Sequence, residues 1–219
     1  MEYQGIKIDH FEHSGFRLKF GNKIIYFDPY NLKENQIEPA DYIFITHDHF
    51  DHCSEKDIKK IVKPQTIIIA SESCSLEHKF LKYLGVKSMV FMSADELAEF
   101  DEVKVQAVPA YNIDKFRSPG VPYHSQKNGK VGYVIEINGV RIYHAGDTDN
   151  IPEMAELENI DVAMLPVSGT YVMTWQEAVE AVRIIKPKIA IPMHYGSIIG
   201  SEEDAIKFKE KAEGEVEII

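Results

Sequence analysis

Apolar residues gather in short runs along most of the chain, and turn-forming residues separate these runs. Runs of this length that are rich in valine, isoleucine and aromatic residues are typical of buried strands. The pattern predicts strands over 16–20, 23–28, 41–46, 66–70, 103–109, 131–137, 140–145, 161–166 and 188–193.

Three stretches between these runs have the polar and apolar spacing of helices. Each begins with a hydroxyl residue that is followed three positions later by a carboxylate, a pair that satisfies the first amides of a helix. The predicted helices are 54–62, 174–185 and 201–213, with the pairs Ser54 and Asp57, Thr174 and Glu177, and Ser201 and Asp204.

Residues 15–28 and 132–147 share one pattern, in which two strands flank a Gly/Asn turn and the second strand leads to an aspartate. Each pattern is followed by another strand that an aspartate opens. Chance similarity between hairpins is the alternative explanation. We interpret the repeat as two similar halves and predict an α/β fold, one domain over 1–219 with two sandwiched sheets and helices outside.

Composition narrows the classes of partner. The chain has 219 residues, 44% of them hydrophobic, a net charge of −11 and a pI of about 5.3. Such a charge disfavours nucleic acid and anionic membranes, although a bound metal ion can still attract an anionic substrate. Two cysteines, no signal peptide and no long apolar run indicate a cytoplasmic protein without a membrane span. The sequence is also compatible with a homo-oligomer.

The segment "DYIFITHDHFDH" (41–52) places several metal-ligand side chains directly after a predicted buried strand. His47 and His49 are two positions apart, so in extended chain they point the same way and can hold one ion. Asp51 and His52 follow where the chain turns into a helix, and can reach a second ion. Imidazole and carboxylate ligands suit zinc, and also manganese, nickel or iron. The alternative is a solvated polar loop.

Two more predicted strands lead into residues that can bind metal, Asp147 after 140–145 and His194 after 188–193. Each has an ordinary alternative, because Asp147 could cap a turn and His194 could be a core histidine. If these strand ends share an edge with the end of 41–46, the side chains converge there.

The motifs "THDHFDH", "AGDTD" and "PMHYG" resemble those of the metallo-β-lactamase-fold hydrolases. "HSGF", "VGYVIEINGVRIYHAGDT" and "IPMHYGS" look most like the branch that contains L-ascorbate-6-phosphate lactonase. The resemblance implies an αββα four-layer sandwich, with two mixed sheets and helices on the outer faces. It also implies one or two divalent ions, the first bound by His47 and His49, the second by Asp51, His52 and His194, and both bridged by Asp147.

The chain departs from the family at Tyr111, where the family usually has another histidine of the first metal site. His124, on a loop rich in proline and glycine, is the candidate replacement, and an exposed loop histidine is the alternative. Tyr111 itself could be a weak ligand or a hydrogen-bond donor to substrate. His13 could orient Asp51 or contact substrate, or lie on the surface.

We therefore expect a metal-dependent hydrolase that uses hydroxide formed at the metal to attack a small ester, lactone or phosphate ester. Asp51 would orient the nucleophile and take its proton. Tyr111, His124 or Ser168 would donate a hydrogen bond to the substrate oxygen. The alternatives are a phosphodiesterase or nuclease of the same superfamily, and a metal-binding module without turnover.

Overall fold

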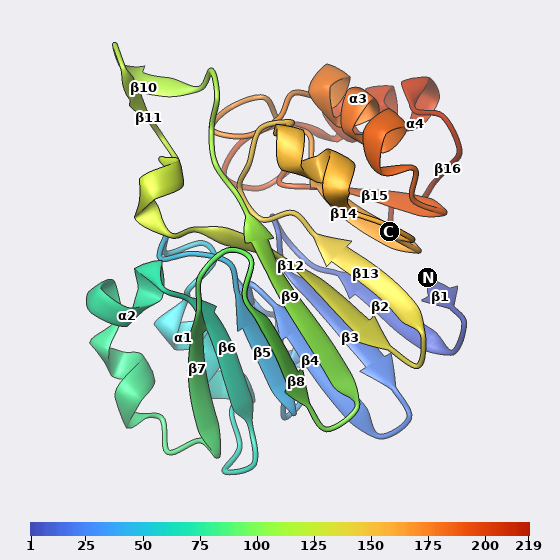
Figure 1. Ribbon diagram of the computed structural model, residues 1–219. Helices are drawn as coiled ribbons and strands as arrows, with labels where there is room; N and C mark the ends of the chain where they lie inside the picture. Colours follow the sequence, from blue (N-terminus) through green and yellow to red (C-terminus); the bar gives the residue numbers. More distant parts are fainter. The chain divides into compact units, whose positions relative to one another are not determined.

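The computed structural model describes residues 1–219, apart from the side chain of Leu76. The chain forms two compact units, residues 1–92 and 93–219, which are described one at a time. Each unit contains one large mixed sheet and a few helices (Figure 1). The predicted α/β class with two mixed sheets is therefore confirmed, and the single domain over 1–219 stays a prediction.

The sheet of the first unit has its strands in sequence order. Strands β1 to β4 pair antiparallel, and β4 to β7 pair parallel. The bounds are β1 (Glu2–Tyr3), β2 (Ile6–His10), β3 (Phe16–Phe20), β4 (Lys23–Phe27), β5 (Tyr42–Ile45), β6 (Ile67–Ser71) and β7 (Ser88–Met92).

Helices α1 (Glu55–Ile61) and α2 (Ser73–Glu77) follow the parallel strands β5 and β6, with the 3-10 turns η1 (Glu34–Gln36) and η2 (Lys79–Tyr83) nearby in the chain. Ile58 and Ile61 of α1 share a buried core with Ile43 and Ile45 of β5. The alternation of side chains along β5 places these isoleucines on one face of the sheet. Burial of this face fixes the strand that leads to His47.

The sheet of the second unit runs in the order β16-β15-β14-β13-β12-β9-β8. Strands β13 to β16 pair parallel, and β8, β9, β12 and β13 pair antiparallel. The bounds are β8 (Leu97–Phe100), β9 (Val103–Pro109), β12 (Val131–Ile137), β13 (Val140–His144), β14 (Val162–Pro166), β15 (Ile189–Met193) and β16 (Glu215–Val216).

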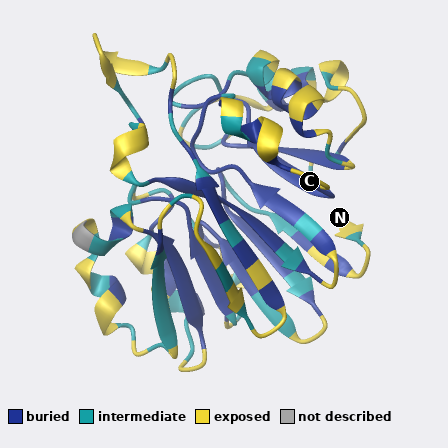
Figure 2. Ribbon diagram, in the orientation of Figure 1, coloured by how far each residue is buried: buried dark blue, intermediate teal, exposed yellow. Residues whose placement is uncertain are grey.

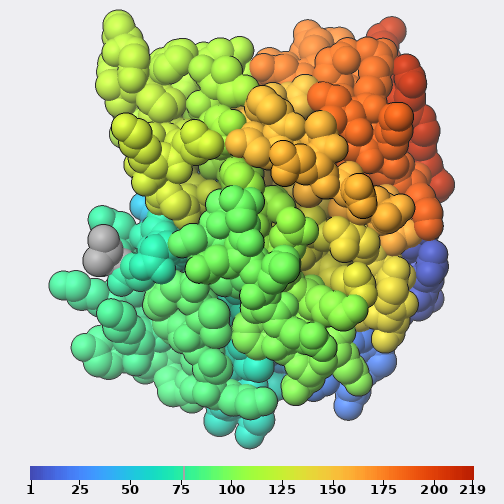
Figure 3. All heavy atoms as spheres, in the orientation of Figure 1, coloured from blue at the N-terminus to red at the C-terminus, as the bar shows by residue number. Residues whose placement is uncertain are grey.

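Helices α3 (Trp175–Ile185) and α4 (Glu202–Lys211) pack on each other and on β14 and β15, and the 3-10 turn η4 (Pro152–Glu156) packs on α3. Their outer faces are exposed (Figure 2). A small hairpin of β10 (Phe116–Ser118) and β11 (Val121–Pro122), followed by η3 (Gln126–Asn128), projects from this unit (Figures 1 and 3).

The repeat seen in the sequence appears in the topology of the two sheets. The antiparallel hairpin β3–β4 is followed by the parallel strand β5, and the hairpin β12–β13 is followed by the parallel strand β14. Asp28 and Asp147 come after the second strand of these two hairpins. The two halves therefore build equivalent strand ends, and both lead into a buried aspartate.

The helix starts match the predicted caps. Ser54 accepts a hydrogen bond from the Asp57 amide, and Thr174 and Glu177 form a reciprocal capping box at the start of α3. Ser201 and Asp204 form the same box at α4. All nine predicted strands are present, with ends that differ by at most one residue.

The sequence pattern did not predict several short strands, among them β2, β7 and β8. Strand β2 ends in the polar residues Asp9 and His10, and β8 is an edge strand whose Leu97 is 76% exposed. Neither shows the apolar run or clean alternation on which the prediction depended. Over the residues that the structure describes, no helix has the length and apolar character that crossing a bilayer requires.

Candidate functional site

In the first unit, the candidate ligands lie on a tight turn that follows β5. The amides of His52 and Cys53 both donate to the His49 carbonyl, at 3.0 and 2.8 Å. This turn folds the chain back on itself before Ser54 starts α1. The segment is therefore compact, and the rings of His47 and His49 lie 4.5 Å apart between centroids.

Asp28 follows the neighbouring strand β4 and holds this turn through hydrogen bonds to Thr46 and His52. Its carboxylate accepts hydrogen bonds from the Thr46 amide at 2.8 Å and the Thr46 hydroxyl at 2.6 Å. It also accepts from Nδ1 of His52 at 2.7 Å. All three residues are buried, which strengthens these charge-assisted bonds.

The bonds around Asp28 determine the proton positions of two imidazoles. Because the Thr46 hydroxyl gives its proton to Asp28, its oxygen accepts from Nδ1 of His47, 3.1 Å away. In the neutral rings of His47 and His52, the proton therefore sits on Nδ1, and Nε2 keeps the lone pair that can bind a metal.

His13 joins this group from the segment before β3. Its Nε2 lies 3.0 Å from Oδ2 of Asp51, and its side chain is fully buried. The surface alternative for His13 is therefore wrong, and the residue is placed to orient Asp51. Ligand atoms of His13, Asp51 and His52 all lie within 4.8 Å of one another, which is compact enough to hold an ion.

In the second unit, the candidate residues follow three adjacent parallel strands. Asp147 comes after β13, Ser168 after β14 and His194 after β15. The carboxyl ends of neighbouring parallel strands share one edge of a sheet, where ligand sites commonly form. Asp147 and His194 are buried at this edge, and the topology explains why residues 47 positions apart meet.

Asp147 is the centre of this second group. Its Oδ2 lies 3.3 Å from Nε2 of His124 and 3.4 Å from Nε2 of His194. Two ligand atoms about 2.0–2.1 Å from one tetrahedral zinc ion lie about 3.3 Å apart. The nitrogen and oxygen donors are thus of the right kind, and spaced so that a divalent cation fits them.

Ser168 contacts His194 and orients it. The Ser168 hydroxyl lies 3.0 Å from Nδ1 of His194 and donates to the Thr170 carbonyl at 3.5 Å. The serine oxygen is then the acceptor for Nδ1 of His194, so that Nε2 faces Asp147. The role of oxyanion donor that the sequence suggested for Ser168 stays a prediction.

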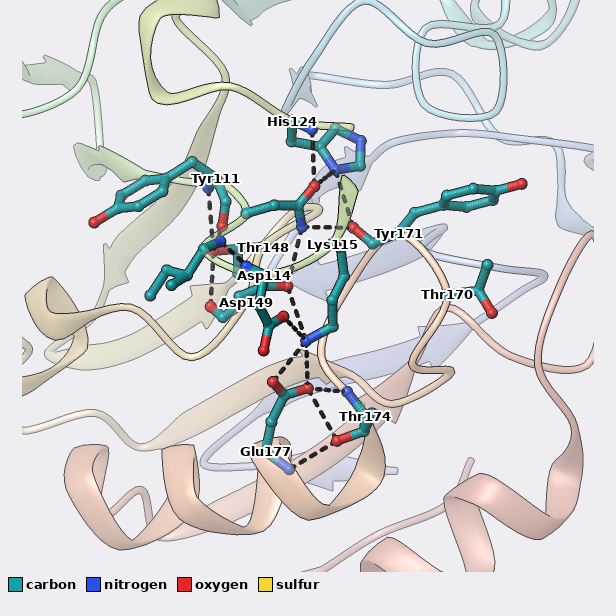
Figure 4. A network of polar contacts seen from close by, with 12 residues as sticks. Tyr111, Asp114, Lys115, His124, Thr148, Asp149, Thr170, Tyr171, Thr174 and Glu177 are labelled. Atoms are coloured by element: carbon teal, nitrogen blue, oxygen red, sulfur yellow. Dashed lines mark hydrogen bonds and ion pairs between the residues drawn. The ribbon is translucent and has the colours of Figure 1, made fainter. Parts of the chain in front are cut away.

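His124 and Tyr111, the two candidates for the altered ligand position, differ in their surroundings. His124 is 1% exposed, so the alternative of an exposed loop histidine is wrong. The Tyr111 hydroxyl donates to both carboxylate oxygens of Glu153, at 2.9 and 3.1 Å. Burial, together with the Glu153 hydrogen bond and charge, raises the pKa of Tyr111 to about 12. The two side chains point in different directions (Figure 4).

Three residues of the two groups have backbone angles that side chains other than glycine rarely adopt. The φ angles are 62° at His13, 60° at His194 and 40° at Asp28. Such left-handed conformations cost about 1 kcal/mol or more and persist where the surrounding structure enforces them. At these positions the fold therefore tolerates backbone strain, and the side chain is held in place.

Comparison with known proteins identifies the family. Residues 7–194 match the β-lactamase superfamily domain. A UPF0173 metal-dependent hydrolase of Nanoarchaeum equitans is 35% identical over 95% of this chain and 92% of its own length. The chain belongs to the β-lactamase superfamily. Within it, the chain is a metal-dependent hydrolase related to the UPF0173 proteins, and its histidine and aspartate groups could bind metal.

Solved structures agree with this assignment. A Parabacteroides distasonis protein assigned as a metal-dependent hydrolase has a TM-score of 0.81 and 34% identity, with 97% of this chain and 92% of that chain covered. The metallo hydrolase Igni18 of Ignicoccus hospitalis has a TM-score of 0.76 at 24% identity, with 98% and 94% covered, and it shows the fold alone. The predicted metallo-β-lactamase family and fold are confirmed.

Sequence reasoning named His13 as a residue that could orient Asp51, but it missed Asp28, Thr46 and Asn112, which contact other candidate ligands. Asp28 could have been found from the internal repeat, because it occupies the hairpin end that corresponds to Asp147. Thr46 and Asn112 carried no signal of their own. Their importance comes from hydrogen bonds to residues distant in the sequence or in adjacent loops.

Proposed function

We propose that this metal-dependent hydrolase acts on a small ester, lactone or phosphate ester, and that its predicted ligands serve one or two divalent ions. Zinc is our first choice, and manganese, nickel and iron suit the same donors. The observation that carries the proposal is the pair of imidazole nitrogens 3.3 and 3.4 Å from one oxygen of Asp147. The ligand set is His47, His49, Asp51, His52, Asp147 and His194, with His124 in place of the usual histidine.

A bound divalent ion would supply Lewis acidity, polarising a carbonyl or phosphoryl oxygen and lowering the pKa of water. The chain's own residues prepare this chemistry. Asp28 and Thr46 hold the protons of His52 and His47 on Nδ1, and Ser168 does the same for His194. The rings are then oriented before any ion binds, which reduces the entropy cost of binding.

Asp51 is our candidate for proton transfer. Its side chain is 13% exposed, whereas that of His13 beside it is fully buried. A carboxylate held by a buried imidazole can orient a water molecule and accept its proton. The roles at the substrate oxygen that the sequence suggested for Tyr111 and His124 stay predictions. Here His124 is proposed as a ligand, and the Tyr111 hydroxyl is held by Glu153.

The substrate is proposed to be small and cytoplasmic, and it can be anionic. A net charge of −11 disfavours a nucleic-acid backbone, because binding such a polymer depends on many basic contacts. A local cation still attracts a single phosphate or carboxylate. We place lactones and phosphate esters first, in line with the lactonase-like motifs.

Metal analysis and a substrate panel test the proposal. The protein would be purified with zinc or manganese, its metal content measured, and its activity followed on an aryl ester, a lactone, an aryl phosphomonoester and a bis-aryl phosphodiester. We expect His47→Ala and His194→Ala each to lower metal content and to reduce kcat/KM by about a hundredfold or more.

The matched control for metal content is Phe50→Ala, since Phe50 lies in the same turn as His47 and is 66% exposed. This variant should keep the metal content of the unaltered protein. Full metal content and turnover in His47→Ala would contradict the ligand assignment. Turnover of the phosphodiester alone would favour the phosphodiesterase alternative.

A further inference from the structure

The imidazole of His124 is surrounded by groups that decide which nitrogen carries its proton. Its Nδ1 lies 3.1 Å from Oδ1 of Asn112 and 3.1 Å from the Tyr171 carbonyl oxygen (Figure 4). Both of these oxygens can only accept. Nδ1 therefore bears the proton, and Nε2, which faces Asp147, presents its lone pair.

The side-chain amide of Asn112 is itself held in one orientation. Its Oδ1 accepts the backbone N–H of His124 at 2.8 Å. Its Nδ2 donates to Oδ1 of Asp149 at 3.0 Å and to the Tyr171 carbonyl at 2.7 Å. Reversing the amide would place donors against donors and acceptors against acceptors. The oxygen of Asn112 is therefore fixed toward His124.

Asp149 organises the backbone on which Asn112 sits. Its Oδ2 accepts the amides of Ile113 at 2.7 Å and Asp114 at 3.1 Å, next to the bond from Asn112. Asp149 is 2% exposed, so these bonds are shielded from water. It lies only two residues after Asp147, and one short segment thus supports a candidate ligand and the loop that carries another.

Lys115 ties the same loop to a helix. Its Nζ lies 2.6 and 2.8 Å from the two carboxylate oxygens of Glu177 and 3.5 Å from Oδ1 of Asp149. Glu177 also accepts from Thr174 in the capping box of α3 (Figure 4). The loop is thereby fastened to the start of a helix that packs on β14.

From these contacts we infer that Asn112 is a positioning residue: it fixes the proton of His124 on Nδ1 and aims Nε2 at Asp147, while Asp149 and Lys115 hold Asn112 in place. The inference rests on the proposed function, because it gives His124 a role as metal ligand. It also gives a role to the loop that follows Tyr111, the position where the family usually has a histidine. This loop supplies both the candidate ligand His124 and Asn112, the residue that orients it.

The expected effect of replacing Asn112 can be judged from other metal sites in which a side chain orients a histidine ligand. Residues that orient a metal-bound histidine change metal affinity or activity by about 10–100-fold when they are replaced. The Tyr171 carbonyl remains as a second acceptor for Nδ1 when Asn112 is lost. We therefore expect a loss of orientation rather than a complete loss of the site.

The unaltered protein provides the first test. Nitrogen-15 NMR of its imidazoles, recorded without metal at a pH above the titration range of histidine, reports which ring nitrogen is protonated. We expect His124 to have protonated Nδ1 and bare Nε2. The opposite tautomer, or a rapid exchange of both, would overturn the inference without the need for any variant.

Asn112→Ala provides the second test, with Asn128→Ala as the control, because Asn128 is exposed on the same loop. Asn112→Ala should mix the His124 tautomers and weaken zinc binding about 10–100-fold in a chelator competition. Lys115→Met, with the exposed Lys127→Met as its control, should weaken zinc binding by a smaller factor. Thermal unfolding checks that each variant is folded.

The outcomes separate the two proposals. If the unaltered protein binds no divalent ion, the proposed function fails, and the tautomer of His124 still decides the positioning role. If it binds zinc and Asn112→Ala binds zinc equally well with the same tautomer, the positioning role fails alone. Should Asn112→Ala not fold, Lys115→Met and the unaltered protein carry the test.

Discussion

Four of the candidate ligand histidines share one pattern at the residue scale: Nδ1 bonds to a protein oxygen, and Nε2 keeps its lone pair. The partners are Thr46 for His47, Asp28 for His52, Asn112 for His124 and Ser168 for His194. Imidazoles oriented in this way lose little freedom when they bind an ion. Both halves of the chain therefore contain candidate ligands whose rings are oriented by hydrogen bonds.

Tyr111 offers a prediction at this scale. Its hydroxyl is committed to both oxygens of Glu153, so we expect Tyr111→Phe to change kcat by no more than about twofold. A tenfold or larger drop in kcat would instead return Tyr111 to the catalytic role predicted from the sequence. Steady-state kinetics on any substrate from the panel would decide, with the half-buried Tyr123→Phe as control.

The candidate ligand residues could be named from the sequence because they lie close together in motifs or directly after apolar strands. Asn112 and Thr46 could not, since an asparagine or threonine has many ordinary roles and only the folded geometry gives it this one. The same holds for Lys115, whose partners Asp149 and Glu177 are 34 and 62 residues away. Long-range polar contacts leave no periodic trace in a sequence.

At the element scale, parallel strands decide where the chemistry lies. Strands β13, β14 and β15 end beside one another, and each leads into a residue of the second group. The fully buried central strands were predictable from apolar runs, whereas the edge strand β8 and the polar end of β2 were not. The elements that position the site were thus the ones that the sequence described best.

Helix α1 follows the turn that carries His49, Asp51 and His52, and its start is held by the buried Asp57. This carboxylate accepts the amides of Asn31 at 2.9 Å and Leu32 at 3.1 Å, and an ion pair from Lys60 at 2.6 Å. Burial raises the pKa of Asp57. Hydrogen bonds from Lys60, Ser54 and Asn31 together lower the pKa by more than burial raises it, so the net pKa lies below its ordinary 3.8.

A depressed pKa of this kind contributes stability that is complete above pH 3.8 and is lost as the pH falls through the lower folded value. We expect Asp57→Asn to lower the free energy of unfolding by about 2 kcal/mol at neutral pH. Urea unfolding of both proteins across pH should show that the difference in free energy of unfolding becomes smaller in acid. The control Glu55→Gln, an exposed residue of the same turn, should change stability by about 0.5 kcal/mol at most. A deficit that stays constant in acid would contradict the role given to the Asp57 charge.

For the whole molecule, the apolar cores are built by strands and helices, and the candidate ligands add little to them. The family match over residues 7–194 includes parts of both compact units. We expect the protein to fold without metal, because its sheets bury their own apolar faces.

Metal should nevertheless stabilise the folded chain by mass action. At a free zinc concentration of about 100 times the dissociation constant, the expected gain is about 2.7 kcal/mol. Calorimetry should show a cooperative transition in the presence of chelator, and a higher Tm with zinc. His47→Ala should gain less than the unaltered protein. A chelated protein without any transition would show instead that metal is required for folding.

The left-handed backbone at His13 and His194 has a consequence for how this enzyme could evolve. Glycine would relax the backbone at both positions, so a stabilising change to glycine there would remove an imidazole. Selection for turnover must continually oppose that change. A related protein that has lost the reaction is expected to have glycine at the positions of His13 and His194 and to keep the same fold.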